Sequence, residues 1–308
     1  MSGILDFHIN PPYVFFNEQS VPFENSDFVV LGVPMDLTSS FRPGSRFAPY
    51  RIRKVSGELE SYCFEAHIDF DSLKVCDLGD LIAGPDVNTT LRKLSSVILE
   101  IVKNNKFFVV IGGEHTITLG EISALMNVFD KKVKILILDA HMDLRDEYPL
   151  GLKISHATVT RRIGEKIGFE NMLLLGVRAA SKEEVRFCES IDFKKYLTAE
   201  TIISNPGILR ESLASFLKPG DNILISIDID VLDPAFAPGV SNPEPLGLSP
   251  HTVMEVLREA VNFPANILGI DVVEVSPPYD ISDTTSFIAS RIIKNTLCYV
   301  ELSKKREG

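Results

Sequence analysis

The sequence predicts an α/β domain in which a mostly parallel sheet lies between two layers of helices. Strand-like apolar runs alternate with helical periods from end to end of the 308 residues, as in proteins built from repeated strand–helix units. The runs are almost continuously apolar, which is typical of strands covered on both faces. No change in composition marks a linker, so we expect one domain over residues 1–308, with a frayed tail at residues 303–308.

Seven short apolar runs are predicted to be the strands of this sheet. They are residues 28–33, 73–76, 107–111, 133–138, 172–175, 223–227 and 267–270. The helices are expected between them, at residues 89–104, 116–129, 181–189, 250–262 and 285–302. Asn88 is expected to cap the first helix. Ser249 and Pro250 are expected to start the fourth, because Ser is favoured at a helix N-cap and Pro in the first turn.

Composition limits the classes of protein to which the chain can belong. The net charge is −11 and the longest basic run is residues 304–306, so the basic surface of a nucleic-acid-binding protein is not expected. No run approaches the ~18 apolar residues of a membrane span. Four scattered cysteines without a CxxC pair, and an N-terminus without the features of a signal peptide, indicate a cytoplasmic protein.

Three short segments that are rich in acidic residues and histidine each follow an apolar run: residues 112–115, 139–143 and 228–230. In an open parallel sheet, ligands bind beyond the carboxyl ends of the strands, so the position and the chemistry of these segments agree. Alternate residues of an extended chain point to the same side, so one segment can direct several donors to one point. The six candidate metal ligands are His115, Asp139, His141, Asp143, Asp228 and Asp230.

Four carboxylates and two imidazoles make a suitable ligand set for two divalent metal ions. Carboxylates held this close together would repel one another, and two divalent cations would neutralise their charge. Oxygen-rich ligation with imidazole and without thiolate favours a metal such as Mn²⁺ over a structural zinc site. Two such ions about 3.5–4 Å apart can bridge a water and convert it into a hydroxide nucleophile. The sequence therefore predicts a two-metal hydrolytic site.

Five motifs resemble those of the ureohydrolases, the arginase–agmatinase family of binuclear manganese enzymes, and together they extend over nearly the whole chain. They are residues 32–36, 42–49, 139–143, 226–239 and, in its agmatinase form, 271–280. The resemblance implies a three-layer α/β/α fold around a parallel sheet of roughly eight strands. It also implies two Mn²⁺ ions per chain and a homo-oligomer, commonly a trimer or a hexamer.

The resemblance further implies how the six ligands are divided between the two ions. One ion would be held by His115, Asp139, Asp143 and Asp228. The other would be held by His141, Asp139, Asp228 and Asp230, so that Asp139 and Asp228 bridge the pair. The chain departs from the family at Glu114, where an Asp usually precedes the metal-binding histidine, and at residues 240–243, which are commonly Gly- and Thr-rich.

We expect the chain to hydrolyse a guanidino compound to urea and an amine. By resemblance, Glu274 pairs with the guanidinium, and a carboxylate suits this role because it can accept two parallel N–H bonds. The leaving group is a basic alkylamine, so it needs a proton as it departs. By resemblance, His156 is the histidine that transfers this proton. Asp143 is a further catalytic candidate, because it can orient the hydroxide.

The loop after Asp143 bears on the choice of guanidine. Asp146 and Glu147 are expected near the mouth of the site, where they would bind a terminal ammonium and disfavour a carboxylate. Arg145 complicates this interpretation, since it could bind a carboxylate or pair with a neighbour. The balance favours agmatine, with Asp146 and Glu147 as substrate-binding residues. Aminopropylagmatine is the close competitor, and arginine, guanidinobutyrate and formiminoglutamate rank lower.

Two other functional classes remain open. A non-catalytic binding protein on the same fold would be expected to have lost a metal ligand, Glu274 or His156, and none of these is missing. A mononuclear zinc deacetylase, whose chemistry occurs on a related fold, needs only one set of ligands. The presence of both His115 and Asp230 argues against that class.

Overall fold

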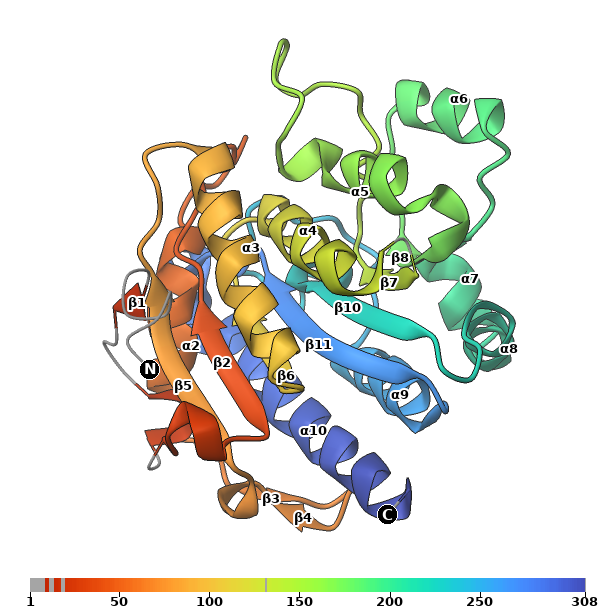
Figure 1. Ribbon diagram of the computed structural model, residues 1–308. Helices are drawn as coiled ribbons and strands as arrows, with labels where there is room; N and C mark the ends of the chain where they lie inside the picture. Colours follow the sequence, from red (N-terminus) through yellow and green to blue (C-terminus); the bar gives the residue numbers. More distant parts are fainter. Residues whose placement is uncertain (1–8, 11–13, 18–19, 131, 308) are drawn as a thin grey trace.

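In the computed structural model, which describes residues 9–10, 14–17, 20–130 and 132–307, nine strands form one sheet between two layers of helices (Figure 1). The order across the sheet is β1–β5–β2–β6–β11–β10–β7–β8–β9. Eight strands run parallel, and β1 pairs antiparallel with β5 at one edge. The predicted α/β/α fold with roughly eight parallel strands is therefore confirmed.

All seven predicted strands are present, with ends that differ by a few residues. The strands of the large sheet are β1 (Ile9–Asn10), β2 (Phe28–Gly32), β5 (Val75–Leu81), β6 (Phe107–Ile111), β7 (Val133–Leu138), β8 (Met172–Val177), β9 (Tyr196–Thr198), β10 (Asn222–Asp228) and β11 (Asn266–Val273). Two further strands, β3 (Tyr62–Cys63) and β4 (Ile68–Asp69), form a separate small sheet. The four strands that precede the predicted site, β6, β11, β10 and β7, are neighbours at the centre of the large sheet.

The sheet is buried on both faces, and its central strands are apolar at most positions. In β6, Phe107, Val109 and Ile111 pack into the core on one face, and Phe108 and Val110 pack into the core on the other. Successive side chains of a strand point to opposite faces, so a continuous apolar run supplies both cores at once. This is the physical basis of the sequence prediction.

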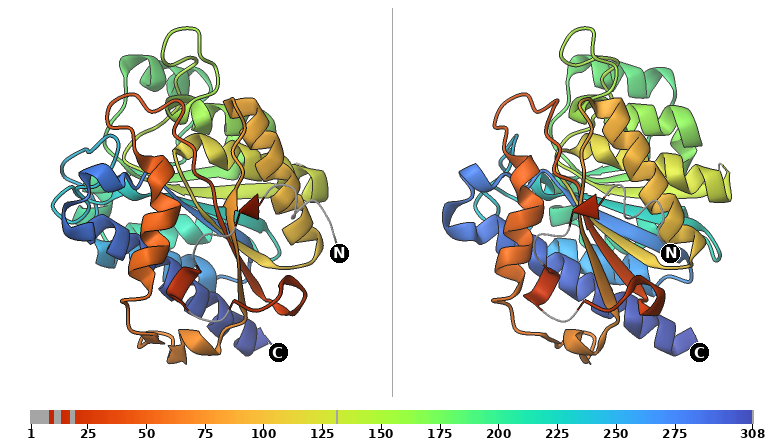
Figure 2. Two further views of the ribbon diagram at one scale, coloured as in Figure 1. Left: turned by 90° about the vertical axis from the view of Figure 1, so that its left-hand side faces the viewer. Right: turned by 60° about the vertical axis from the view of Figure 1, so that its left-hand side comes forward.

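The helices divide between the two faces (Figures 1 and 2). One layer contains α3 (Val87–Lys103), α4 (Thr118–Phe129) and α5 (Val159–Ile167). The other layer contains α2 (Ala48–Ser56), α7 (Ala199–Ser204), α8 (Gly207–Phe216), α9 (Pro250–Asn262) and α10 (Thr284–Glu307). Helix α6 (Lys182–Ser190) lies near the carboxyl end of β8, above the sheet in the view of Figure 1.

Two boundaries differ from the sequence prediction. Helix α3 begins at Val87 and is capped by Asp86, whose carboxylate accepts a hydrogen bond from the Thr89 N–H, so Asn88 lies inside the first turn and is not the cap. Helix α10 continues to Glu307 through most of the segment that was expected to fray, and residue 308 lies outside the described residues. Lys304 contributes to this continuation, since its ammonium lies 4.4 Å from the centre of the Phe28 ring.

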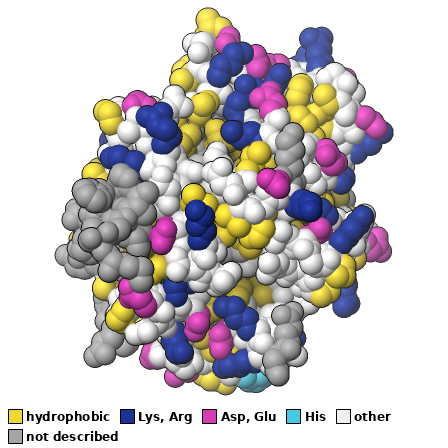
Figure 3. All heavy atoms as spheres, viewed as in Figure 1, with side chains coloured by type: hydrophobic (Ala, Val, Ile, Leu, Met, Phe, Trp, Pro, Cys, Tyr) yellow, Lys and Arg dark blue, Asp and Glu magenta, His cyan; other side chains and the backbone are white. Residues whose placement is uncertain are grey.

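Several short elements were not predicted, among them α2, α5, α7, α8 and β9. Within the described residues, no helix has both the length and the apolar character that a membrane span requires. On the face of the molecule shown in Figure 3, acidic and basic side chains are interspersed.

Candidate metal centre and substrate cavity

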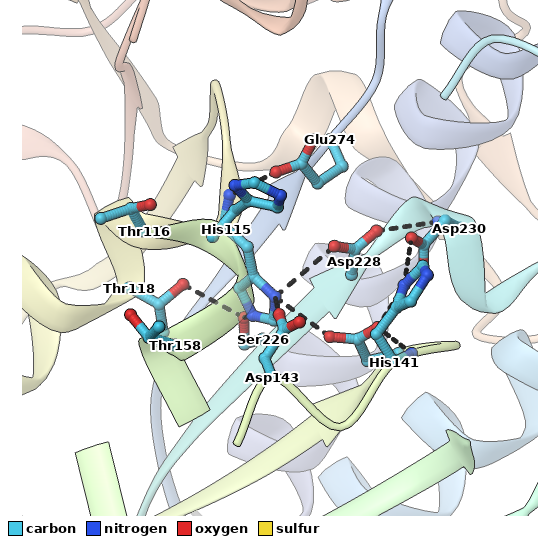
Figure 4. A network of polar contacts seen from close by, with 12 residues as sticks. His115, Thr116, Thr118, His141, Asp143, Thr158, Ser226, Asp228, Asp230 and Glu274 are labelled. Atoms are coloured by element: carbon cyan, nitrogen blue, oxygen red, sulfur yellow. Dashed lines mark hydrogen bonds and ion pairs between the residues drawn. The ribbon is translucent and has the colours of Figure 1, made fainter. Parts of the chain in front are cut away.

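Three strands, β6, β7 and β10, deliver the candidate ligands to one place beyond their carboxyl ends, and β11, which lies between β6 and β10, delivers Glu274 to the same place (Figure 4). Two of the ligands also shape the local backbone. Asp139 accepts a hydrogen bond from the His141 N–H at 2.6 Å, and Asp228 accepts one from the Asp230 N–H at 3.0 Å. An aspartate that bonds to the backbone two residues later stabilises a turn. Each D-x-H or D-x-D segment therefore leaves its strand in a turn that its first aspartate stabilises.

The first group of ligands surrounds the Nδ1 atom of His115. Its distances to carboxylate oxygens are 3.1 Å to Asp139, 3.3 Å to Asp143 and 3.5 Å to Asp228. His115 and Asp139 are fully buried, and the other two side chains are nearly so. Three carboxylates thus converge on one imidazole nitrogen, in a spacing that allows His115, Asp139 and Asp228 to share one metal ion.

The second group surrounds His141, whose Nδ1 atom lies 3.0 Å from Asp230 and 3.6 Å from Asp139. Asp139, His141 and Asp230 have the spacing of a second metal site. Asp139 directs Oδ2 to the His115 group and Oδ1 to the His141 group. The structure thus gathers all six predicted ligands, with Asp139 between the two groups.

The chemistry of this cluster fits divalent cations. Two of its buried atoms, His115 Nδ1 and Asp139 Oδ2, have no hydrogen bond within the described part of the chain, and a buried polar atom without a partner is costly. Burial, and next the neighbouring carboxylate of Asp139, raises the pKa of Asp143 to about 7. Burial and then Asp230 raise the pKa of Asp228 well above its ordinary value. Cations would relieve both the unpaired atoms and the repulsion.

The far side of His115 is held in the orientation that ligation requires. Its Nε2 atom lies 3.1 Å from Ser226 Oγ, and Ser226 Oγ donates to Asp271 Oδ1 at 2.7 Å. Since the serine proton is used for Asp271, Ser226 accepts from the Nε2–H of the histidine, and Nδ1 is left with its lone pair facing the carboxylates. Neither Ser226 nor Asp271 was expected to have a role, although they lie in the motifs at residues 226–239 and 271–280.

Glu274 follows β11 and lies against the metal ligands. Its Oε1 accepts the backbone N–H of His115 at 2.7 Å, and its Oε2 is buried without a hydrogen bond among the described residues. Burial, and next the nearby Glu114, raises its pKa to about 8.

Glu274 and Asp143 both adopt a left-handed backbone, with φ of 65° and 50°, a conformation that is uncommon for residues other than glycine. Such backbone strain often occurs at functional sites.

A cavity of about 300 Å³ opens above the cluster. His141, Asp143, Asp228 and Asp230 line it together with Glu274 and His156. Further lining side chains come from the loops around it and include Ser40, Arg145, Tyr148, Ser181, Glu184, Asn242 and Glu244. The metal-type ligands, the predicted guanidinium partner and the predicted proton donor therefore face one space. Asn242 also places the unusual 240–243 segment at this cavity.

His156 is buried at the wall of this cavity. Its backbone N–H donates to Thr38 Oγ1 at 3.0 Å, and its ring Nε2 lies 3.1 Å from Ser40 Oγ. Burial, and next the nearby imidazoles of His141 and His115, lowers its pKa to about 4. The ring of Tyr148 meets the imidazole edge-on, with 6.1 Å between the ring centres. Thr38, Ser40 and Tyr148 were not singled out from the sequence.

Asp146 and Glu147 do not line the cavity, which corrects the placement expected from the sequence. Asp146 pairs with Lys153 and, at 3.1 Å, with Arg162, and hydrogen bonds from these two groups lower its pKa. Glu147 lies 3.8 Å from Lys153. These cations hold both acids on the outer side of the loop. This pairing could not be predicted from the sequence, because Lys153 and Arg162 meet Asp146 only when the loop folds.

The charged side chains that line the cavity outside the metal-type ligands and Glu274 include Arg145, Glu184 and Glu244. The guanidinium of Arg145 lies 4.7 Å from the centre of the Tyr148 ring, and its Nε is 3.9 Å from Glu184.

Glu244 belongs to a loop fixed by Arg178, which donates to the backbone carbonyls of Glu244, Asp230 and Leu232. The same arginine thus connects a metal-binding segment with the cavity rim.

Fold and site together define a three-layer α/β/α protein with two adjacent groups of metal-type ligands at the carboxyl ends of its central strands. The family model described as "Arginase family" matches residues 26–298, and the chain therefore belongs to the arginase family. This family generally consists of binuclear metal-dependent hydrolases. The chain is accordingly an arginase-family hydrolase, as its motifs indicated.

Individual relatives agree with this assignment. An agmatinase of Halalkalibacterium halodurans is 35% identical over 276 residues, which cover 89% of this chain and 92% of that protein. A human mitochondrial guanidino acid hydrolase is 33% identical over 285 residues, which cover 89% of this chain and 78% of that protein. The crystal structure of an agmatine ureohydrolase of Thermoplasma volcanium is 34% identical, with a TM-score of 0.85 and 94% of each chain covered.

Proposed function

We propose that this protein hydrolyses a guanidino compound to urea and an amine, and that agmatine is its substrate, with putrescine as the amine. The observation that carries the proposal is the unpaired, buried Oε2 of Glu274, which belongs to a residue lining the same cavity as the metal-type ligands. A carboxylate oxygen without a partner at this point is suited to a planar cation with N–H donors on its edge.

Two Mn²⁺ ions are the proposed cofactors. His115, Asp139, Asp143 and Asp228 would hold one ion, and His141, Asp139, Asp228 and Asp230 would hold the other. Oxygen and imidazole ligands without thiolate suit Mn²⁺, and such a pair of ions, when bound, supplies a hydroxide at neutral pH. Asp143, which lines the cavity beside these ligands, is proposed to orient that hydroxide.

Glu274 is proposed to bind the guanidinium with the oxygen that His115 does not use. Because Oε1 is already fixed by the His115 N–H, the carboxylate cannot rotate freely, and the position of Oε2 is set by the strand that carries it. Substrate held in this way presents its central carbon to the metal cluster. A fixed orientation of this kind lowers the entropic part of the barrier.

His156 is proposed to deliver the proton to the departing amine from Nε2. Its pKa of about 4 makes the free imidazole neutral at pH 7, so it must first take a proton within the site before giving it away. Ser40 Oγ, 3.1 Å from Nε2, keeps that atom directed toward the cavity, which both residues line. Proton transfer by a positioned histidine typically contributes a factor of about 10²–10⁴ to the rate.

The tail of agmatine is an ammonium, and Glu244 is its proposed partner. Glu244 lines the cavity and forms no ion pair within the described residues, whereas Arg145 has Glu184 beside it. The agmatinases among the relatives support this choice. Aminopropylagmatine, which also ends in an amine, fits the same argument.

A guanidino acid such as guanidinobutyrate is the second candidate, favoured by a different observation. Arg145 places a guanidinium at the rim of the cavity, with its nearest carboxylate partner as far as 3.9 Å away. An arginine with free N–H donors is suited to a substrate carboxylate, and the human relative is named a guanidino acid hydrolase. Arginine carries an amine as well as a carboxylate and ranks below both candidates.

We also propose that the protein is a cytoplasmic homo-oligomer, a trimer or a hexamer, as the family resemblance implies. Gel filtration with light scattering would measure the assembly directly. A monomer at micromolar concentration would refute this part of the proposal.

The deciding experiment measures urea release from Mn²⁺-loaded protein with agmatine, aminopropylagmatine, guanidinobutyrate and arginine in parallel. We expect the highest kcat/KM with agmatine. The matched control is Glu274→Gln, which should retain its metal content and lose at least about 10³-fold in kcat/KM, because it replaces a charged partner of the guanidinium. Faster turnover of guanidinobutyrate would transfer the assignment to the second candidate. Full activity of Glu274→Gln would remove Glu274 from the mechanism.

A further inference from the structure

Glu114 connects the metal-binding segment to a loop that is distant in sequence. It directly precedes His115, but its carboxylate turns away from the metal ligands and accepts two hydrogen bonds from Thr38, from the backbone N–H at 2.7 Å and from Oγ1 at 2.8 Å. The backbone of Glu114 contacts the same segment, since the Glu114 N–H donates to the Met35 carbonyl at 2.7 Å. Burial raises the pKa of Glu114, and the hydrogen bonds from Thr38 oppose this rise.

The close approach of the two segments depends on Gly113. A Cβ atom at this position would lie 1.9 Å from the Met35 carbonyl oxygen, so no larger residue fits there. Glu114 can therefore lie directly beside the loop that begins at Met35. Its side chain, one methylene longer than the aspartate expected from the family resemblance, reaches both donors of Thr38 at once.

Thr38 in turn contacts His156 at two atoms. Its Oγ1 accepts the His156 backbone N–H at 3.0 Å and lies 3.3 Å from the ring Nδ1. A hydroxyl has one proton to donate. When that proton is donated to the Glu114 carboxylate, Oγ1 can only accept from Nδ1, so the neutral imidazole carries its hydrogen on Nδ1. Nε2 then carries no hydrogen and accepts from the Ser40 hydroxyl at the cavity.

We propose that Glu114 and Thr38 are positioning residues that fix the tautomer and the orientation of His156, so that Nε2 is the atom that takes up and releases the proton. This inference rests on the proposed role of His156 in guanidine hydrolysis. It also explains why the neutral imidazole of His156 carries its hydrogen on Nδ1 and leaves Nε2 able to take up a proton. It also assigns a function to the residue at which the chain departs from its family.

Three variants test the chain of contacts. Thr38→Val has almost the same shape but no hydroxyl, and we expect kcat for agmatine to fall at least about 10-fold with little change in KM. Thr38→Ser keeps the hydroxyl and should retain most of the activity. In Glu114→Gln, the amide carbonyl can accept from the Thr38 N–H, and the amide N–H₂ can donate to Thr38 Oγ1. The Thr38 hydroxyl then donates to His156 Nδ1 instead of to Glu114. Its kcat should fall as well.

Ser39→Ala is the matched control, since this neighbouring hydroxyl is buried without a hydrogen bond within the described residues. It should leave kcat unchanged. Metal content and thermal unfolding of each variant would show whether folding or the metal site has been disturbed. If Thr38→Val does not fold, Glu114→Gln and Thr38→Ser still carry the test.

The second measurement does not depend on turnover. In protein labelled with ¹⁵N-histidine, the ring nitrogens of His156, assigned by their loss in His156→Gln, should show the hydrogen on Nδ1, and Glu114→Gln should shift the hydrogen toward Nε2. Hydrogen on Nε2 in the unmodified protein would overturn the inference, as would unchanged kcat in Thr38→Val. A protein that shows the expected tautomer but releases no urea from any guanidine would instead refute the proposed function.

Discussion

Glu244 and Arg145 lie on one cavity rim with opposite charges, and within the described residues Arg145 lies 3.9 Å from the carboxylate of Glu184, whereas Glu244 forms no ion pair. If Glu244 binds the ammonium of agmatine, Glu244→Gln should raise KM about 10-fold and leave kcat nearly unchanged, because a charge-assisted hydrogen bond to the tail contributes about 1.5–3 kcal/mol. Steady-state kinetics with agmatine and with butylguanidine, which has no charged tail, would check this. The KM of butylguanidine should not change.

Asp146→Asn is the control for this residue-scale prediction. Its carboxylate pairs with Lys153 and Arg162 outside the cavity, so the substitution should leave both KM values as they are. An Asp146→Asn variant with a raised KM for agmatine would restore the role that the sequence assigned to this loop. An unaltered KM in Glu244→Gln would exclude Glu244 as the ammonium partner.

The site residues that the sequence could identify are those that lie in short segments at strand ends. Asp139, His141 and Asp143 are close in sequence, and the parallel sheet places Asp228 and His115 beside them. The contacts of Thr38 and Glu114 could not be identified, because they join residues 76 positions apart through a loop whose path the sequence does not specify. The predicted position of Asp146 at the mouth of the site was wrong for a related reason, since the charge of a carboxylate does not reveal whether it pairs with a basic side chain of the same protein.

The start of α3 provides a test at the scale of elements. Asp86 accepts both the N–H and the Oγ1–H of Thr89, whereas Asn88 is the second residue of the helix. Asp86→Ala should lower the free energy of unfolding by about 1 kcal/mol, because it leaves N–H groups at the helix end without a partner. Asn88→Ala should be neutral or slightly stabilising, since Ala is the better helix former. Urea denaturation of the two variants would decide between Asp86 and Asn88 as the cap.

Long, apolar elements were predictable, and most short amphipathic ones were not, although α6 was expected at residues 181–189. The central strands read as continuous apolar runs because both of their faces are covered. By contrast, α5 has nine residues, and its buried positions are separated by charged ones. Strand β9 has three residues, all only partly buried. Over such lengths, the tertiary contacts that select helix or strand outweigh the local pattern.

A buried acid pair beneath the site makes the stability of the whole molecule dependent on pH. Glu121 is fully buried, and burial, followed by the adjacent Asp271, raises its pKa well above its ordinary value near 4.5. Above that ordinary value the folded protein therefore binds more protons than the unfolded chain, so the contribution of Glu121 to stability is complete at low pH. It is lost as the pH rises toward the raised pKa.

Glu121→Gln should remove this dependence, because the amide has nearly the same shape as the protonated acid and has no proton to lose. At about pH 8 the variant should be more stable than the unmodified protein by roughly 1 kcal/mol or more, and near pH 5 the difference should shrink. Chemical denaturation across this range, with the exposed Glu189→Gln as control, measures the effect. Parallel pH curves for the Glu121→Gln variant and the unmodified protein would contradict this account.

The left-handed backbone at Asp143 and Glu274 has a consequence for how the chain can change. Each such residue costs roughly 1–3 kcal/mol relative to a conformation free of strain, and glycine would adopt the same backbone without that cost. A library of this chain selected only for thermal stability should therefore accumulate glycine at these two positions and lose the chemistry proposed for them. At both positions the residue that best serves the fold differs from the one that the reaction requires, so stability and activity are selected in opposite directions.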